Sequence, residues 1–146
     1  MISNVINNNE YKQMVAEQIK EVLDHLLILN QEFAVTANIK GVSFNPELPN
    51  PISEILAPFS LFVLSNYSYE SLVINDDNIQ FEAGFGKENF GSVVTIPFNA
   101  IFQIIVEESI LFINPTATLD SDFVNVDQKQ KSLNAFKLNN KNKGLV

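Results

Sequence analysis

The spacing of apolar residues changes once along this chain, and that change constrains its fold more than any other feature. Between Tyr11 and Leu27, apolar side chains recur every three or four positions, which is the period of one face of an α-helix. From Phe33 to Lys40, larger apolar residues alternate with small or polar ones, which is the period of a half-buried strand. We therefore expect one amino-terminal helix followed by a β-sheet domain.

The predicted helix has a start signal and a broad apolar stripe. Asn7 and Glu10 have the spacing of a capping box, with Asn in place of Ser or Thr. A helix of about 20 residues is roughly 30 Å long. One small sheet need not cover that whole length, so part of the stripe is available to a second subunit. The stripe consists of Tyr11, Met14, Val15, Ile19, Val22, Leu23, Leu26 and Leu27.

The sequence from residue 33 to residue 118 predicts a meander of about six short antiparallel strands. Four prolines between residues 46 and 58 predict a long connection. The stretch Asn75-Asp76-Asp77-Asn78 has the composition of a hairpin turn, and Pro97 suits the first position of a short helix through 99–103. Strands this short and this close together do not form a parallel sheet with helical crossovers, so the expected class is α+β, mainly β. We place the strands within residues 33–39, 61–64, 72–74, 79–85, 92–96 and 110–113.

Composition excludes several classes of function. The chain has nine Lys, no Arg and 17 acidic residues, giving a formal charge of −8, which argues against a surface that reads nucleic acid. The absence of Cys excludes a disulfide framework, a thiolate zinc site and a cysteine nucleophile. No apolar run reaches the roughly 18 residues of a membrane span, and the amino terminus lacks a signal-peptide pattern. We predict a cytoplasmic protein with neither nucleic acid nor membrane as a partner.

The last 28 residues differ from the rest in charge and pattern. Residues 31–118 carry 2 Lys and 10 acidic residues, a net charge of −8, whereas residues 119–146 carry 5 Lys and 3 acidic residues, a net charge of +2. This last segment is rich in Asn, Lys and Gln and has no apolar period, which is typical of a disordered tail. The predicted organisation is a domain over 1–118 and a tail over 119–146.

Few side chains suit catalysis or metal binding. The single histidine, His25, stands beside Asp24, and we favour an exposed helix residue over a general base. Asp76 and Asp77 are interpreted as a solvated turn; Glu107 and Glu108 are interpreted as a surface corner, although the spacing of paired carboxylates leaves an acid–base role open. No glycine-rich phosphate loop is present. We therefore predict no enzymatic activity, no catalytic residue, no metal and no cofactor.

Three stretches together resemble a known family. Residues 11–27 resemble a dimerisation helix, and residues 72–86 resemble a peptide-tag-binding hairpin. The stretch Ile96-Pro97-Phe98-Asn99-Ala100-Ile101 follows that hairpin and resembles a recurrent signature of the same family. Residues 132–137, Ser-Leu-Asn-Ala-Phe-Lys, resemble a short docking peptide. In this order and separation, the stretches resemble the SspB family of protease-delivery adaptors, and they are closest to its alphaproteobacterial branch.

The resemblance implies a homodimer whose subunits contain an open Sm-like antiparallel β-barrel. It implies binding of ssrA-type degradation tags in a groove and tethering of the tagged polypeptide to the unfoldase ClpX of the ClpXP protease. The implied groove residues are Tyr67, Ser68, Tyr69, Ala83, Gly84, Phe85 and Gly86. The implied ClpX-docking residues are Ser132, Leu133, Asn134, Ala135, Phe136 and Lys137, and the implied dimer interface contains Met14, Val15, Ile19, Val22 and Leu26.

Pattern alone leaves some of these roles open. Tyr67 and Tyr69 stand at alternate positions after a predicted strand, so they are expected to share a face, where they either cap the core or line a groove. Phe85 suits the core and the groove equally, whereas Phe81 favours the core. The chain also departs from the family at Glu70, where an aromatic residue is usual.

One other function fits the composition equally well, and a second is disfavoured by it. A secretion chaperone is also a small, acidic, dimeric α+β protein that binds an extended segment of its partner. An Sm-like RNA binder rests on fold analogy alone, and the absence of Arg disfavours it.

Overall fold

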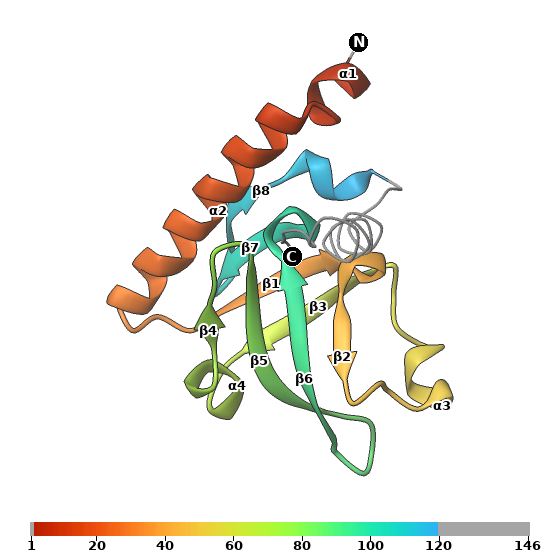
Figure 1. The fold of residues 1–146 in the computed structure, drawn as a ribbon. Coiled ribbons are helices and arrows are strands. Elements are labelled where there is room, and N and C mark those ends of the chain that lie inside the picture. Colours follow the sequence, from red (N-terminus) through yellow and green to blue (C-terminus); the bar gives the residue numbers. More distant parts are fainter. Residues whose placement is uncertain (1, 120–146) are drawn as a thin grey trace, which may run out of the picture.

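The computed structural model describes residues 2–119, which form one long helix and two four-stranded antiparallel sheets (Figure 1). The helical elements are α1 (Ile2–Ile6), α2 (Asn9–Ile28), α3 (Asn50–Ser53) and α4 (Tyr67–Glu70), with 3-10 turns η1 (Ile39–Gly41), η2 (Phe98–Ala100) and η3 (Pro115–Thr118). The strands are β1 (Phe33–Asn38), β2 (Ser43–Asn45), β3 (Phe59–Leu64), β4 (Val73–Ile74), β5 (Asn78–Phe85), β6 (Phe90–Pro97), β7 (Ile101–Val106) and β8 (Ser109–Ile113). The predicted α+β class with a long amino-terminal helix is confirmed.

The strands divide between two sheets. Sheet A has the order β3-β1-β7-β8, and sheet B has the order β2-β6-β5-β4. In Figure 1 the strands of sheet B cross in front of sheet A, and α2 lies along one side of both. The core is therefore enclosed by the inner faces of the two sheets and by one face of α2.

The prediction of about six strands was too low, because β2 and β7 were missed. Residues 99–103 were expected to be helical, but the helical part is only the turn η2, and Ile101 begins a strand. β7 lies between β1 and β8 and buries Ile101 and Ile104, so pairing on both sides outweighs the local helix signal from Pro97. β2 has only three residues and pairs on one side, which leaves little pattern to recognise.

The cap of α2 is one residue later than predicted. Asn8 is the N-cap, and its side-chain oxygen accepts a hydrogen bond from the Tyr11 backbone N–H at 2.9 Å. Asn7 instead accepts from the Lys12 ammonium at 3.0 Å. A side-chain acceptor satisfies one of the free N–H groups at the start of a helix, so Asn8 is the residue that sets where α2 begins.

Most of the apolar stripe of α2 is used within the subunit. Val15, Ile19 and Leu26 are buried in the core, and Val22 packs against it. These residues were predicted to form a dimer interface, and the burial corrects that assignment for Val15, Ile19 and Leu26. The buried residues of α2 belong to one core cluster with residues of both sheets. Of the five residues predicted for the interface, only Met14 is classed as exposed, with half of its side chain accessible.

Strand register decides which side chains enter the core. In sheet B, Ile79 pairs with Ile96 and Phe81 pairs with Val94, and all four are buried. In sheet A, Phe62 pairs with Val35, which is also buried. The Phe62 and Phe81 rings meet edge to face with centroids 6.1 Å apart, so this contact joins the two sheets. The preference of Phe81 for the core is confirmed.

A buried amide fastens the last described segment to the sheets. The Asn114 side chain donates to the carbonyls of Asn99 and Ile101 at 3.1 and 2.8 Å, and it accepts from the Thr116 N–H at 2.9 Å and hydroxyl at 2.6 Å. Asn114 has no exposed surface. All four of its hydrogen-bonding positions in this site are therefore occupied by protein groups.

Replacing this amide is expected to destabilise the domain strongly. Asn114→Ala removes four hydrogen bonds and leaves buried partners without water, so we predict a loss of about 2–4 kcal/mol in the free energy of unfolding. Urea denaturation monitored by circular dichroism measures the change. Thr118→Ala, which removes one exposed hydrogen bond to the Pro115 carbonyl, is the control and should cost less than about 1 kcal/mol. Equal losses for the two variants would contradict the role of the buried amide.

Candidate peptide-binding groove

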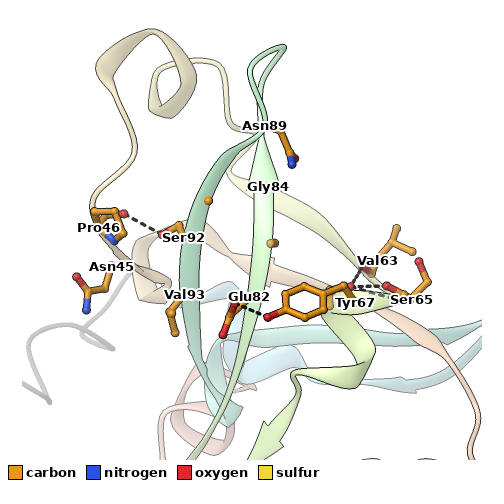
Figure 2. A pocket seen from close by; sticks show the side chains of 13 residues that line it. Asn45, Pro46, Val63, Ser65, Tyr67, Glu82, Gly84, Asn89, Ser92 and Val93 are labelled. Atoms are coloured by element: carbon orange, nitrogen blue, oxygen red, sulfur yellow. Dashed lines mark hydrogen bonds between the residues drawn. The ribbon is translucent and has the colours of Figure 1, made fainter.

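A groove of about 660 Å³ crosses the β5–β6 hairpin (Figure 2). Figure 2 shows Asn45 and Pro46, at the end of β2, on one side of the hairpin, and Val63, Ser65 and Tyr67 on the other. The hairpin thus forms the floor, and two segments distant in sequence form the walls. The lining residues are Asn45, Pro46, Val63, Ser65, Tyr67, Ser68, Glu82, Ala83, Gly84, Asn89, Gly91, Ser92 and Val93.

Two glycines face each other in the floor. Gly84 on β5 pairs directly with Gly91 on β6, and both are exposed. Directly opposed residues project to the same face of a sheet, so neither strand contributes a side chain at this position of the floor. A Cβ added at Gly91 would meet no atom within 4 Å, whereas one added at Gly84 would overlap the Asn89 side-chain oxygen. The floor therefore has a notch at Gly91, where another backbone can approach the strands closely, whereas the Asn89 side chain covers Gly84.

Two asparagine amides border this notch. Asn89 lies in the turn after β5 with a φ of 53°, and its side chain folds back over Gly84. Asn45 is the last residue of β2, opposite Val93. Within residues 2–119, neither side-chain amide hydrogen-bonds to another group. Each amide carries two donor hydrogens and an acceptor oxygen, which are the groups that pair with a peptide backbone.

A phenol–carboxylate contact holds one wall in place. The Tyr67 hydroxyl donates a hydrogen bond to Glu82 Oε1 at 2.8 Å, which joins α4 to β5 (Figure 2). This hydrogen bond, and next the negative charge of Glu82, raise the pKa of Tyr67 above its usual value of 10.0. The hydroxyl therefore keeps its proton, and keeps donating to the carboxylate, to a higher pH than an unperturbed tyrosine would.

Serine hydroxyls fix the same wall from the other end. The Ser68 hydroxyl accepts from the Ser65 N–H at 3.0 Å and lies 2.8 Å from the Ser65 carbonyl. The Ser71 hydroxyl accepts from the Glu82 backbone N–H at 2.9 Å. These hydrogen bonds anchor α4, a four-residue helical turn that has too few internal hydrogen bonds to be stable alone.

Four of the seven predicted groove residues line this groove: Tyr67, Ser68, Ala83 and Gly84. Tyr69, Phe85 and Gly86 do not. The Tyr69 ring packs edge to face on Phe33 at 6.3 Å, and the Phe85 ring packs edge to face on Phe44 at 5.5 Å.

The prediction that Tyr67 and Tyr69 share a face was wrong. It assumed an extended chain after β3, but the two residues lie in the helical turn α4, where residues two apart point in different directions. Tyr67 is 61% exposed, whereas Tyr69 packs against the core. Gly86 has a φ of 76°, so it serves the turn between β5 and β6 and not the groove.

Several lining residues were missed from the sequence. Asn45 ends a strand that was not predicted and Pro46 follows it, and Asn89 lies between two predicted strands, where no site residue was expected. Gly91 lay just before the predicted strand 92–96, and only the observed register places it opposite Gly84.

The described residues offer little for other chemistry. No three His, Asp or Glu side chains among residues 2–119 are grouped as a metal site. His25 is exposed on α2, as expected, and Glu107 and Glu108 form the exposed turn between β7 and β8. None of the helices in the same range combines the length and apolarity needed to span a membrane. The predicted ClpX-docking residues 132–137 and the predicted tail from residue 120 lie outside the described residues.

Comparison with known proteins does not identify a family. No protein-family model, no curated protein and no solved structure matches this chain. A functional assignment must therefore rest on the geometry and chemistry of the groove.

Removing the charge of Glu82 is expected to lower the pKa of Tyr67. In Glu82→Gln the hydrogen bond weakens and the charge repulsion with a phenolate disappears, so the pKa moves towards 10.0. A raised pKa in the folded state stabilises the fold below pH 10, and this contribution is lost as pH rises through the folded-state pKa. Alkaline titration of phenolate absorbance measures the shift, with Tyr67→Phe assigning the signal. An unchanged titration in Glu82→Gln would contradict the contact.

Proposed function

We propose that this chain is an adaptor of the SspB type. In this proposal, the two sheets form an open Sm-like arrangement that carries the groove. An ssrA-type degradation tag binds there, and the carboxyl-terminal tail tethers the tagged polypeptide to ClpXP. The observation that supports it most is the notch at Gly91, bordered by the side-chain amides of Asn45 and Asn89. It adjoins β5, which belongs to residues 72–86, the stretch to which the sequence resemblance assigns tag binding.

The groove suits an extended peptide. A peptide strand crossing the hairpin would approach the glycines with its backbone, and the amides of Asn45 and Asn89 would replace its hydrogen bonds to water. Side chains that alternate along the peptide would then enter the groove or point away from it. No catalytic group is needed for this recognition.

Charge limits which peptide residues can enter the groove. Residues 1–118 carry 4 Lys and 14 acidic residues, a net charge of −10, and Glu82 lies in the groove itself. An acidic side chain in the groove would face this field at short range. We therefore expect neutral tag residues to occupy the groove and acidic tag residues to lie outside it.

In the proposal, residues 119–146 act as a tether. A coil of 28 residues has an end-to-end distance of about 30 Å. Holding cargo within that distance of the unfoldase raises its local concentration towards the millimolar range, which increases capture without new contacts.

Filling the notch is expected to abolish tag binding. Gly91→Leu places a side chain in open space on the floor, so the domain should fold while the peptide is displaced. Fluorescence anisotropy of a labelled ssrA-type peptide should show saturable binding by the natural chain and binding weaker by about tenfold or more in the variant. Gln18→Leu, which places the same apolar side chain on the exposed face of α2, is the control and should bind normally.

Two outcomes would overturn this assignment. Normal binding by Gly91→Leu would place the peptide elsewhere. Absence of binding by the natural chain would remove the tag as cargo and leave the secretion chaperone as the next function to test, with the same groove holding a segment of a secreted partner.

Deleting the tail is expected to separate binding from delivery. Removing residues 129–146 should abolish accelerated degradation of a tagged fluorescent substrate by ClpXP at low substrate concentration, while peptide affinity stays unchanged. Removing only residues 138–146 retains Ser132 to Lys137 and is the control, which should still deliver. Loss of peptide binding in the longer deletion would mean that the two activities are not separable.

A further inference from the structure

A hollow on the outer face of sheet A combines an apolar floor with two carboxylates at one end. Its volume is about 540 Å³. We call it the sheet A hollow, and its lining includes Ala34, Leu61, Val63, Ile105, Glu32 and Glu107.

The floor of the sheet A hollow is more exposed than apolar residues on a sheet usually are. Ala34 pairs directly with Val63 on one side and with Ile105 on the other, so the three side chains project to the same face. Val35, the next residue of β1, is buried, so that face is the outer one. Leu61 is 58% exposed and Val63 57%. A solvated sheet face normally carries polar side chains, so this apolar floor indicates an interaction surface.

The two carboxylates lie at the same end of the sheet A hollow. Because Ala34 pairs with Ile105, extending this antiparallel register by two residues brings Glu32 opposite Glu107. Both glutamates are exposed, and the Glu32 carboxylate accepts a hydrogen bond from the Asn66 backbone N–H at 2.8 Å, which holds it in place. Among residues 2–119, no Lys forms an ion pair with either glutamate. The hollow therefore suits a peptide that carries apolar side chains next to cationic ones.

The chain itself contains such a segment. Residues 128–146 carry five Lys and no acidic residue, a net charge of +5, whereas residues 1–127 carry 4 Lys and 17 acidic residues, a net charge of −13. Within this basic segment, Lys131 and Lys137 enclose Leu133 and Phe136. Opposite charge attracts the segment to the acidic body, whereas the acidic body of a second copy is repelled. Charge complementarity thus selects residues 128–146 as the occupant.

The length of chain that follows the described residues matches the distance to be covered. The 3-10 turn η3, just before Leu119, is fastened to the end of β1, because the Asn38 amide donates to the Ala117 carbonyl at 2.9 Å. Glu32 is six positions from Asn38, roughly 20 Å at 3.3 Å per residue. A coil of 12 residues, the separation between Leu119 and Lys131, has an end-to-end distance of about 17–21 Å.

Linkage compensates for a weak contact. Ion pairs between exposed side chains contribute little to binding one at a time. A short flexible linker gives an effective concentration of about a millimolar, so even a contact of millimolar affinity is substantially occupied within one molecule.

We propose that residues 128–146 bind in the sheet A hollow of the same molecule, with apolar side chains on the floor and lysines against Glu32 and Glu107. The inference does not depend on the proposed function, because it rests on the charge and exposure of the hollow and on the charge of the segment. Where the proposed function also holds, the hollow and ClpX compete for residues 132–137, so the contact restrains docking until ClpX displaces it.

Paramagnetic broadening in the full chain tests the inference. The chain contains no Cys, so Asn139→Cys carries a single nitroxide label. The label should broaden the backbone amide resonances of Ala34, Leu61 and Ile105 and leave that of Gly91, in the groove, unchanged. Dilution by about tenfold should preserve the broadening, because a contact within one molecule does not depend on concentration.

Three results of this measurement would overturn the inference. Broadening at Gly91 in place of the sheet A hollow would put the segment in the groove. Broadening that disappears on dilution would mean that another molecule supplies the segment. No broadening on the body would mean that the segment does not dock.

A charge-matched pair of variants tests the role of the two glutamates. Glu32→Gln with Glu107→Gln removes both charges, and the Gln side-chain oxygen at position 32 still accepts from the Asn66 N–H. This variant should lower the bound population by about twofold or more. Glu47→Gln with Glu54→Gln makes the same change in net charge at two exposed positions outside the hollow and should keep the broadening. Equal effects of the two pairs would overturn the inference.

Leu61→Thr tests the apolar floor separately, because Thr favours strands and adds no charge. It should also reduce the broadening, while the amide spectrum of the rest of the domain stays unchanged. Val63 is left unchanged because it also lines the groove. Full broadening in Leu61→Thr would contradict apolar docking on the floor.

Discussion

The eight-residue pairing of β5 with β6 is the constraint on which the rest of the structure depends. Because side chains alternate along a strand, one register sends Ile79 and Phe81 into the core and leaves Glu82 and Gly84 on the outer face. A slip of one residue would exchange those faces. Core packing and the floor of the groove are thus fixed by the same backbone pairing.

The walls of the groove depend on contacts that bring distant segments to this hairpin. The Ser92 hydroxyl donates to the Pro46 carbonyl at 2.8 Å, which fixes the end of β2 on β6. On the other side, the Tyr67–Glu82 hydrogen bond fixes α4 on β5. Each wall is therefore attached directly to the floor, so a bound peptide would meet a surface that is already organised.

The sequence predicted the elements that a local residue pattern marks clearly. It failed where pairing with strands distant in sequence determines the structure. The extent of α2 and the hairpin turn at Asn75–Asn78 follow from local pattern, and the turn closes with a hydrogen bond from the Asn75 N–H to the Asn78 carbonyl at 2.8 Å. β7 could not be recognised, because its burial comes from β1 and β8. Likewise, Tyr67 and Gly84 were predicted to lie in the groove, but Asn45 belongs to a strand identified only by its partner β6.

The central claim is that an extended peptide binds across the paired glycines. Titrating the isotope-labelled protein with an ssrA-type peptide and following assigned backbone amide resonances tests it most directly. The account predicts that the amides of Gly84, Asn89 and Gly91 shift progressively and saturably, while those of α2 remain unchanged. Shifts confined to another surface, or no shifts at all, would contradict it.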